Sequence, residues 1–274
     1  MSSLFVGRCL SLVMLCTMVS IVMSVFGCAQ ADDSVLRMAL GEKLREVSGL
    51  AWYENSVLAI ADERARIYRV DFEQGRISKL RHFGEKSEKG DFEGLAVIGD
   101  QVYAITSDGL LYAGGVAEAD NTFTRVDTGL GELCEIEGLA HRHDLLFVLC
   151  KEAHKKHLGQ QLLIYAWNPV TQNRVPAADL VVPWSELVFE GKKYLPSALE
   201  YVQPAQADPH WLILAARNQG WLVLSEQGAV LRQGVLPNRQ QHPQAEGVLV
   251  TQDYTFVADE GKQTGTLTRY QGSF

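Results

Sequence analysis

Hydrophobic residues in most of this chain come in short runs separated by Gly, Asp and Asn. One phrase opens several of these runs: Glu or Ser, then a small residue, then apolar residues. The five copies are "VSGLAW" at Ser48, "FEGLAV" at Glu93, "IEGLAH" at Glu137, "PSALEY" at Ser197 and "AEGVLV" at Glu246. A second and a third apolar run follow each copy, and such runs between turn residues predict β-strands.

The copies recur at intervals of 45, 44, 60 and 49 residues. A period of about 40–50 residues built from strands is typical of a β-propeller, whose blades are small antiparallel sheets. A helical repeat of similar length would show a sustained period of about 3.6 residues, and the sequence has none. The pattern therefore predicts an all-β fold, a five-bladed β-propeller.

The last copy has room for only three strands before the chain reaches Phe274. The apolar segment 34–40, "SVLRMAL", precedes the first copy and has no partner there. We expect this N-terminal strand to complete the last blade, because that arrangement closes the ring and leaves no free sheet edge.

The longest interval contains an extra stretch near 177–196, which we interpret as an insertion. Its aromatic residues favour an ordered segment over a disordered one. Two interpretations remain open. The stretch is either a lid or rim beside one mouth of the channel, with Lys192 and Lys193 exposed, or a surface loop without a role in function.

The first 31 residues differ from the rest, because an almost uninterrupted apolar run, 9–26, follows Arg8. We interpret 1–31 as an export signal and 32–274 as the propeller domain; a membrane-spanning helix is the competing interpretation. "VFGC" resembles a lipoprotein cleavage site before Cys28, and "AQA" resembles an ordinary signal-peptidase site ending at Ala31. Either cut predicts a bacterial envelope protein, periplasmic and anchored by lipid if Cys28 is modified.

The formal net charge of −8 and the pI near 5.4 disfavour nucleic acid as a partner. Binding a phosphate backbone needs clustered Lys and Arg. We expect a monomer whose partner is an envelope ligand or protein that the residues do not identify.

Only two of the five cysteines, Cys134 and Cys150, lie outside the N-terminal segment. If 135–140 and 145–149 are antiparallel strands, positions summing to about 285 face one another, so Cys134 lies opposite Cys150 or its neighbour. An oxidising compartment would allow a disulfide. Two buried free thiols are the alternative.

The first strand of a propeller blade is the innermost one, so the residue that opens each phrase should lie nearest the channel. The second strand returns antiparallel and brings its last residues to the same mouth. The first group is Ser48, Glu93, Glu137, Ser197 and Glu246, and the second is Asp62, Asp108, Glu152, Arg217 and Asp259.

Three glutamates around one axis repel each other, so their charge must be balanced. Ca²⁺ suits this setting, because it takes six to eight oxygen ligands from carboxylates, hydroxyls and carbonyls, whereas Mg²⁺ demands stricter geometry and zinc favours His and Cys. The alternative is that the glutamates accept backbone hydrogen bonds or pair with Lys151 and Arg217. The glycines that follow them are expected to give crowded strands room.

The phrases and their continuations carry a resemblance. "VSGLAW…LAIADE…RIYRVD", "FEGLAVIGDQVYAI", "EIEGLAH…LLFVLCKE", "LPSALEY" and "QAEGVLV…FVADEG" resemble the SdiA-regulated family of bacterial envelope β-propellers, related to NHL-repeat propellers, over 47–261. The resemblance implies a five-bladed propeller with a calcium site whose ligands are Glu93, Glu137 and Glu246. Ser48 and Ser197 replace Glu at two positions. The resemblance does not imply an activity.

Motifs of known nucleophiles and phosphate-binding loops, such as G-x-S-x-G and G-x-x-x-x-G-K, are absent from the sequence. The histidines of "HRH" and "HKKH" fall where turns are expected, so we interpret them as solvated. A calcium-dependent hydrolase of an ester, lactone or phosphoester is possible, with Asp62 or Asp259 as base and Lys151 or Arg217 stabilising an anion. We favour a binding module with structural calcium.

Overall fold

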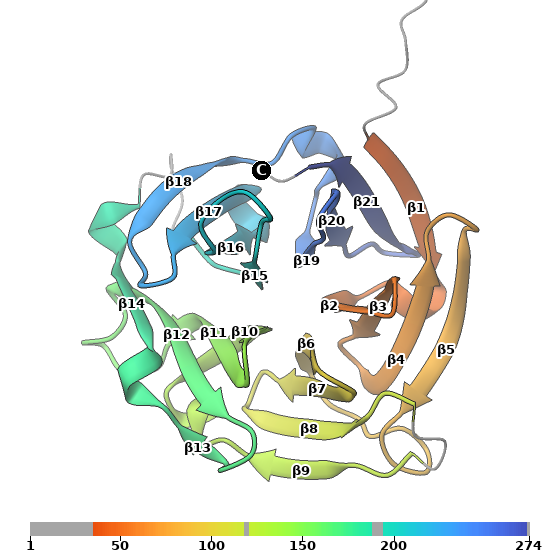
Figure 1. Cartoon of the computed structure of the whole chain (residues 1–274), viewed down its shortest axis with the longest axis horizontal. Coiled ribbons are helices and arrows are strands. Elements are labelled where there is room, and N and C mark those ends of the chain that lie inside the picture. Colours follow the sequence, from red (N-terminus) through yellow and green to blue (C-terminus); the bar gives the residue numbers. More distant parts are fainter. Residues whose placement is uncertain (1–34, 118–120, 188–193, 273–274) are drawn as a thin grey trace, which may run out of the picture. The chain divides into compact units, whose positions relative to one another are not determined.

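The computed structural model describes residues 35–117, 121–187 and 194–272, which lie within one compact unit, Ser34–Phe274. Five antiparallel sheets stand around a common axis in the order of the sequence (Figure 1). This arrangement is a five-bladed β-propeller, so the predicted fold class is confirmed. The predicted export signal, 1–31, and its possible lipidation site, Cys28, lie outside the described residues.

The first two blades each use four consecutive strands. Blade 1 contains β2 (Val47–Tyr53), β3 (Ser56–Ala61), β4 (Arg64–Asp71) and β5 (Arg76–His82). Blade 2 contains β6 (Phe92–Ile98), β7 (Gln101–Thr106), β8 (Leu110–Gly115) and β9 (Thr124–Asp127).

The next two blades follow the same plan, with one variation. Blade 3 contains β10 (Cys134–Arg142), β11 (Leu145–Ala153) and β12 (Gln161–Asn168), against which both β13 (Asn173–Arg174) and β14 (Leu180–Pro183) pair. Blade 4 contains β15 (Ala198–Val202), β16 (His210–Ala215), β17 (Gly220–Ser225) and β18 (Val230–Val235).

The last blade joins the two ends of the described chain. It contains β19 (Ala245–Val250), β20 (Tyr254–Asp259), β21 (Gly265–Gln271) and β1 (Val35–Gly41), which pairs antiparallel with β21. The predicted closure by the N-terminal strand is therefore confirmed. Without β1, the backbone groups of β21 on that side would form an open edge.

Short 3₁₀ turns are the only helical elements among the described residues. They are η1 (Glu42–Leu44), η2 (Leu130–Glu132), η3 (Pro176–Ala178), η4 (Trp184–Glu186), η5 (Ala216–Asn218) and η6 (Arg239–Gln241). In the same residues, no helix is long and apolar enough to cross a membrane.

The hydrophobic core is divided among the spaces between blades. Each of five clusters of buried side chains joins two neighbouring blades, the last and the first included. Alternation along the strands explains this division, because successive side chains point to opposite faces of a sheet and each face meets a different neighbour. No blade therefore has a core of its own.

The stretch near 177–196 is only in part an insertion. Its strand β14 pairs with β12 over four residues and so serves as an outer strand of blade 3. The sequence did not reveal this role, because residues 169–179 separate β14 from β12. Within that separation, the short β13 pairs with another part of the same edge of β12. Farther along, Leu195 and Pro196 lie at a mouth of the channel. Lys192 and Lys193 fall outside the described residues.

Candidate functional site

The opening residue of the repeated phrase occupies a β-bulge in four of the five innermost hairpins. The ladders skip Ser48, Glu93, Glu137 and Glu246, whose neighbours on either side remain paired. A bulge inserts one unpaired residue and re-aims its side chain. The strands that carry these bulges, β2, β6, β10 and β19, are the innermost strands of their blades (Figure 1). Each bulge lies in the first half of its strand.

Glycine follows each bulge because neighbouring innermost strands nearly touch there. A Cβ atom added to Gly49 would lie 2.8 Å from the backbone nitrogen of Leu95 in the next blade. One added to Gly94 would lie 2.5 Å from the backbone nitrogen of Leu139. These separations are too short for any side chain, so the glycines let the first strands crowd around the axis.

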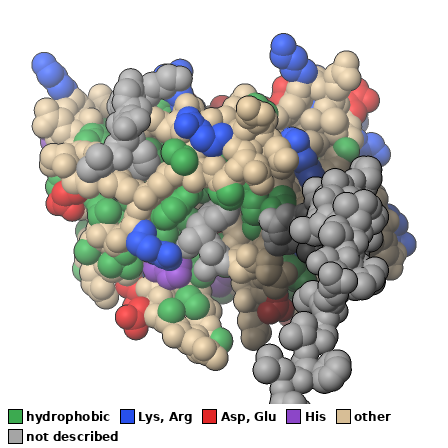
Figure 2. Space-filling model, turned by 90° about the horizontal axis from the view of Figure 1, so that it is seen from above, with side chains coloured by type: hydrophobic (Ala, Val, Ile, Leu, Met, Phe, Trp, Pro, Cys, Tyr) green, Lys and Arg blue, Asp and Glu red, His purple; other side chains and the backbone are tan. Residues whose placement is uncertain are grey.

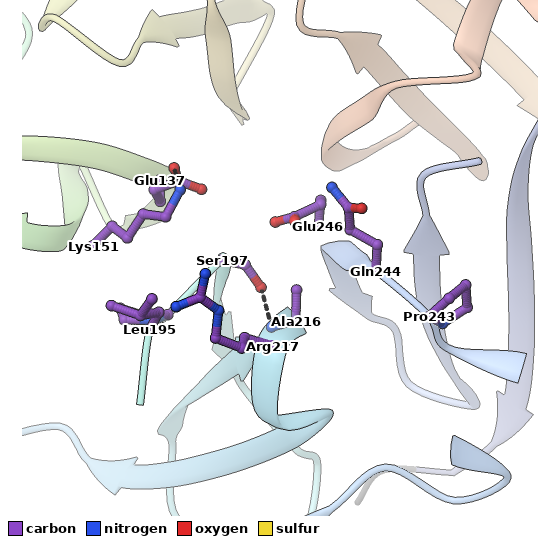
Figure 3. A pocket seen from close by; sticks show the side chains of 10 residues that line it. Glu137, Lys151, Leu195, Ser197, Ala216, Arg217, Pro243, Gln244 and Glu246 are labelled. Atoms are coloured by element: carbon purple, nitrogen blue, oxygen red, sulfur yellow. Dashed lines mark hydrogen bonds and ion pairs between the residues drawn. The ribbon is translucent and has the colours of Figure 1, made fainter. Parts of the chain in front are cut away.

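Two cavities meet at this end of the channel. The larger one, which we call the mouth pocket, has a volume of about 320 Å³ and is lined by Glu137, Lys151, Ser197, Arg217, Gln244 and Glu246 among others. A narrow cavity beside it is lined by Ser48, Glu93 and Glu246. Glu246 lines both cavities. In Figure 3, Glu137 and Glu246 face the same open space from two blades.

Lys151 supplies the cation nearest to these glutamates. Its ammonium group forms an ion pair with Glu137, and it lies 3.3 Å from a carboxylate oxygen of Glu135. The side chain of Glu137 is only 7% exposed, so its charge is largely removed from water. For Glu137, the structure therefore shows the alternative arrangement, in which a lysine balances the charge of the glutamate.

The carboxyl groups resist ionisation. Burial raises the pKa of Glu93 to about 10, with further contributions from the charges of Glu137 and Asp91. Burial also raises the pKa of Glu137 to about 7, against the opposing effect of Lys151. The pKa of Glu246 lies well above its ordinary value, again mainly through burial. Close carboxylates in a dry site favour the protonated form, so negative charge at this mouth is incompletely balanced.

A second ring of polar residues lies two positions before the first, and sequence reasoning missed it. Its members are Glu46, Asp91, Glu135 and Gln244, and in blade 4 the position is Leu195. A polar residue stands at the same offset in four of the five repeats, so the recurrence was a readable signal. The second strand of blade 5 leads to Glu260, whose carboxylate bonds with Gln244 and whose pKa burial raises to about 7.

The two serines at the opening positions have different roles. The hydroxyl of Ser197 donates to the carbonyl of Ala245 at 2.7 Å and accepts from the amide of Ala216 at 3.0 Å, so it joins blade 4 to blade 5. Ser48 is only 4% exposed, and its hydroxyl has no hydrogen-bond partner among the described residues. A buried polar atom without a partner is costly and suggests a missing ligand.

The residues predicted one step farther out separate into distinct environments. Burial raises the pKa of Asp62 to about 6, and Glu46 adds to the effect. Arg217 lines the mouth pocket. Asp108 accepts a hydrogen bond from Thr106 at 2.5 Å, and Glu152 pairs with Glu135 in the ladder.

Asp259, which was considered as a catalytic base, is fully buried. Its carboxylate lies 2.6 Å from the Nδ1 atom of His242, and the other ring nitrogen of His242 lies 2.5 Å from the hydroxyl of Tyr270. Because Asp259 and His242 are both 0% exposed, this cluster has no access to a substrate. Asp259 is therefore placed to stabilise blade 5.

Cys134 and Cys150 form a disulfide between β10 and β11, with Cα atoms 5.7 Å apart. Their register differs from the expected one, because Cys134 pairs with Ala153 and Cys150 with Ile136. The position of the turn explains the difference, because Arg142 pairs with Leu145 and paired positions therefore sum to 287. The two bulges cancel each other in the register, since Glu137 is the extra residue on β10 and Lys151 is the extra residue on β11. The disulfide therefore crosses the hairpin diagonally, next to Glu137 and Lys151.

Within the described ranges, no group of three or more His, Cys, Asp or Glu side chains is arranged to hold a metal ion. On the face seen in Figure 2, side chains of both charge signs lie in small separate groups, with hydrophobic and uncharged surface between them.

No family model and no curated protein matches the chain. Solved structures do resemble it. Glutaminyl cyclase from Myxococcus xanthus has a TM-score of 0.55 at 14% identity, over 86% of this chain and 94% of that one. A structural genomics protein of unknown function from Bacteroides thetaiotaomicron has a TM-score of 0.53 at 12% identity, over 85% of this chain and 76% of that one.

A luciferin-regenerating enzyme has a TM-score of 0.51 at 10% identity, over 87% of this chain and 97% of that one. At such identities the likeness shows the fold alone. Enzymes are among the proteins that share it, and so is a protein of unknown function. The propeller expected from the resemblance is confirmed, whereas membership of the SdiA-regulated family stays a prediction.

Proposed function

We propose that the acidic mouth of the propeller binds one calcium ion through Glu93, Glu137 and Glu246, and that the protein is a binding module. The ion would tie three blades together at the axis, and the mouth pocket beside it would receive the ligand. Arg217 and Lys151 line that pocket, so an anionic group on the ligand would find both cations and the ion within one cavity.

The observation that carries this proposal is the shared position of the acidic residues at bulges. Three innermost strands each direct one glutamate toward the same end of the channel, and Glu246 lines a cavity with each of the other two. Lys151 and Arg217 oppose them, but Glu135 and Glu260 add two more carboxylates. These crowded carboxyl groups ionise together only if a positive charge balances them, so the site favours uptake of a cation.

The donor atoms available suit calcium. Carboxylate oxygens and the unpartnered hydroxyl of Ser48 are hard ligands, which Ca²⁺ accepts in flexible geometry. Lys151 competes with calcium for Glu137, because its ammonium group forms an ion pair with that carboxylate. Calcium binding would require this ion pair to loosen, so we expect Lys151 to weaken the affinity for the ion.

The test is calcium binding by the full chain, measured by calorimetry after treatment with EDTA. We expect one ion per chain, and stabilisation of about 2.7 kcal/mol, or about 5–10 °C in Tm, at calcium concentrations roughly a hundredfold above Kd. Glu93→Gln, Glu137→Gln and Glu246→Gln should each abolish the response. Lys151→Gln should bind calcium more tightly than the unaltered chain.

Glu54→Gln is the matched control, because Glu54 lies in the hairpin turn at the far end of β2 and is exposed. It should respond to calcium as the unaltered chain does. Melting that ignores both EDTA and calcium, with no heat of binding, would show that the glutamates belong to blade architecture alone.

Hydrolysis is a second candidate, favoured by the groups at this mouth that are not proposed to bind calcium. Arg217 lines the mouth pocket, and Asp62, whose pKa burial raises to about 6, lies near enough to Glu260 to raise the pKa of that carboxyl group. A carboxyl group near neutrality can accept a proton from water, and a guanidinium can stabilise an anion. A bound calcium ion would supply polarisation of an ester or phosphoester oxygen. Ester and phosphoester turnover lost with EDTA and in Arg217→Gln would support this candidate, and inactivity against such a panel would reject it.

A further inference from the structure

A third cavity lies at the opposite end of the same innermost strands. It has a volume of about 740 Å³, and we call it the distal pocket; its lining includes Trp52, His141, Tyr201, Gln206, Gln252 and Asp253. Trp52, His141 and Tyr201 each stand four residues after the opening residue of their phrase. Four residues of strand span about 13 Å, so this pocket is separate from the acidic mouth.

One long loop builds a wall of the distal pocket. The innermost hairpins of blades 1, 2 and 3 turn in two residues, and that of blade 5 turns in three, 251–253. In blade 4, the connection between β15 and β16 runs over 203–209, and Gln203, Pro204, Ala205 and Gln206 line the pocket. Pro204 and Pro209 restrict the conformations of this loop, so its shape is partly fixed before any ligand arrives.

The two aromatic residues of the distal pocket differ: Tyr201 is held in place by its neighbours, whereas Trp52 is open to solvent. The hydroxyl of Tyr201 bonds with Glu226, and its ring packs against Trp211 with centroids 4.7 Å apart. Trp52 is different, because 41% of it is exposed to solvent. Exposed tryptophan at the edge of a cavity is a large apolar surface for a ligand to cover.

The polar lining is rich in amides and poor in charge. Gln203, Gln206 and Gln252 line the pocket together with one carboxylate, Asp253, and none of its described lining residues is Lys or Arg. Amide groups both donate and accept hydrogen bonds, as sugar hydroxyls do. The lack of Lys and Arg disfavours an anionic ligand, and a quaternary ammonium could make no hydrogen bond with Gln206 or Gln252.

We propose that the distal pocket binds a neutral oligosaccharide, with a sugar ring stacked on Trp52 and its hydroxyls bonded to Gln206, Gln252 and Asp253. A pyranose has apolar C–H faces and a rim of hydroxyl groups, and the pocket is lined by both an exposed indole and amide side chains. Its volume falls within the range of small-molecule sites. The proposal is independent of calcium at the other mouth.

The experiment titrates the full chain with maltohexaose, cellohexaose and chitohexaose while following tryptophan fluorescence and heat. We expect at least one of the three to bind in the micromolar to millimolar range and to change the fluorescence. Trp52→Ala should weaken that binding by about tenfold or more. Gln252→Ala should weaken it less, and Glu93→Gln should leave it unchanged.

Trp52 and Gln252 are not buried, so both variants should melt as the unaltered chain does. Binding that survives Trp52→Ala and Gln252→Ala unchanged would overturn the proposal. So would a lack of binding to all three sugars at millimolar concentration. Tetramethylammonium is the competing probe: binding of this cation, dependent on Trp52, in the absence of sugar binding would assign the pocket to a cationic ligand instead.

Discussion

At the scale of single residues, ionising the buried glutamates of the mouth is unfavourable in the folded state. Glu93 shows this most clearly, since burial and the neighbouring charges of Glu137 and Asp91 raise its pKa to about 10. The folded chain therefore keeps a proton on Glu93 at a pH where the unfolded chain has lost it. A cation bound at the mouth would stabilise the ionised carboxylates, and because it binds only the folded state, it would also stabilise the fold.

This linkage predicts how Glu93→Gln changes stability with pH. The pKa is raised on folding, so the free energy of unfolding falls as pH rises from about 4.5 toward about 10. Without calcium, Glu93→Gln should be more stable than the unaltered chain at pH 8, by about 1–3 kcal/mol. The two should be equally stable near pH 4, where both states hold the proton.

Urea unfolding in EDTA at the two pH values measures the difference, with Glu54→Gln as the control that should follow the unaltered chain. A Glu93→Gln protein that is no more stable at pH 8 would show that the site already balances this carboxyl group. With calcium present, the advantage of Glu93→Gln should shrink, because only the unaltered chain gains from the ion.

At the scale of elements, the innermost hairpins follow one design with one exception. Blades 1, 2, 3 and 5 carry a bulge at the opening residue, whereas no register shift interrupts the β15–β16 ladder of blade 4. Ser197 there fastens blade 4 to Ala245 of blade 5 instead. Blade 4 also has the long loop 203–209. It therefore bonds to blade 5 at one end of the channel and forms a wall of the distal pocket at the other.

The hairpin of β10 and β11 supports a prediction about the disulfide. Cys134 and Cys150 are separated by 16 positions in sequence. Closing a loop of this size stabilises the folded state by about 2–4 kcal/mol, mainly by restricting the unfolded chain. Replacing both cysteines with alanine should therefore lower the free energy of unfolding by that amount.

Urea unfolding with and without reductant provides the measurement. Reductant should destabilise the unaltered chain and leave the Cys134→Ala, Cys150→Ala variant unaffected. If the unaltered chain and the double variant unfold at the same urea concentration without reductant, the ladder alone holds this hairpin.

At the scale of the whole molecule, stability depends on closing the ring. The core is shared between neighbouring blades, so blade 5 must be complete for blade 1 to pack against it. Strand β1 supplies the missing strand, and Leu40 at its end is only 2% exposed within the cluster that joins blades 5 and 1. The N-terminal strand therefore closes the ring of blades and stabilises the entire domain.

This role predicts that Leu40→Ala lowers the free energy of unfolding by about 2–4 kcal/mol, because it leaves a cavity in a shared cluster. Leu36 on the same strand is 40% exposed, so Leu36→Ala should change stability by about 0.5 kcal/mol or less. Urea unfolding of the two variants tests the comparison. Equal effects would mean that packing at the end of β1 does not secure the ring.

The sequence by itself determined the blade count, the innermost position of the repeated phrase and the closing role of 34–40. It could do so because each blade is formed by hairpins between neighbours in sequence, and hydrophobic alternation with turn residues encodes such hairpins locally. The opening residues Glu93, Glu137 and Glu246 were identified for the same reason, since their place in the repeat fixes their place at the axis.

Only the tertiary structure decided how these residues are balanced and what surrounds them. Glu137 pairs with Lys151, Asp259 is buried against His242, and Ser48 finds no hydrogen-bond partner for its hydroxyl in the described part of the chain. These features depend on bulges and on side chains that neighbouring elements bring together. The distal pocket depends in addition on a loop whose length breaks the repeat. The direction of a side chain at a bulge and the shape of an irregular loop leave no periodic signal, so the sequence alone does not reveal these contacts.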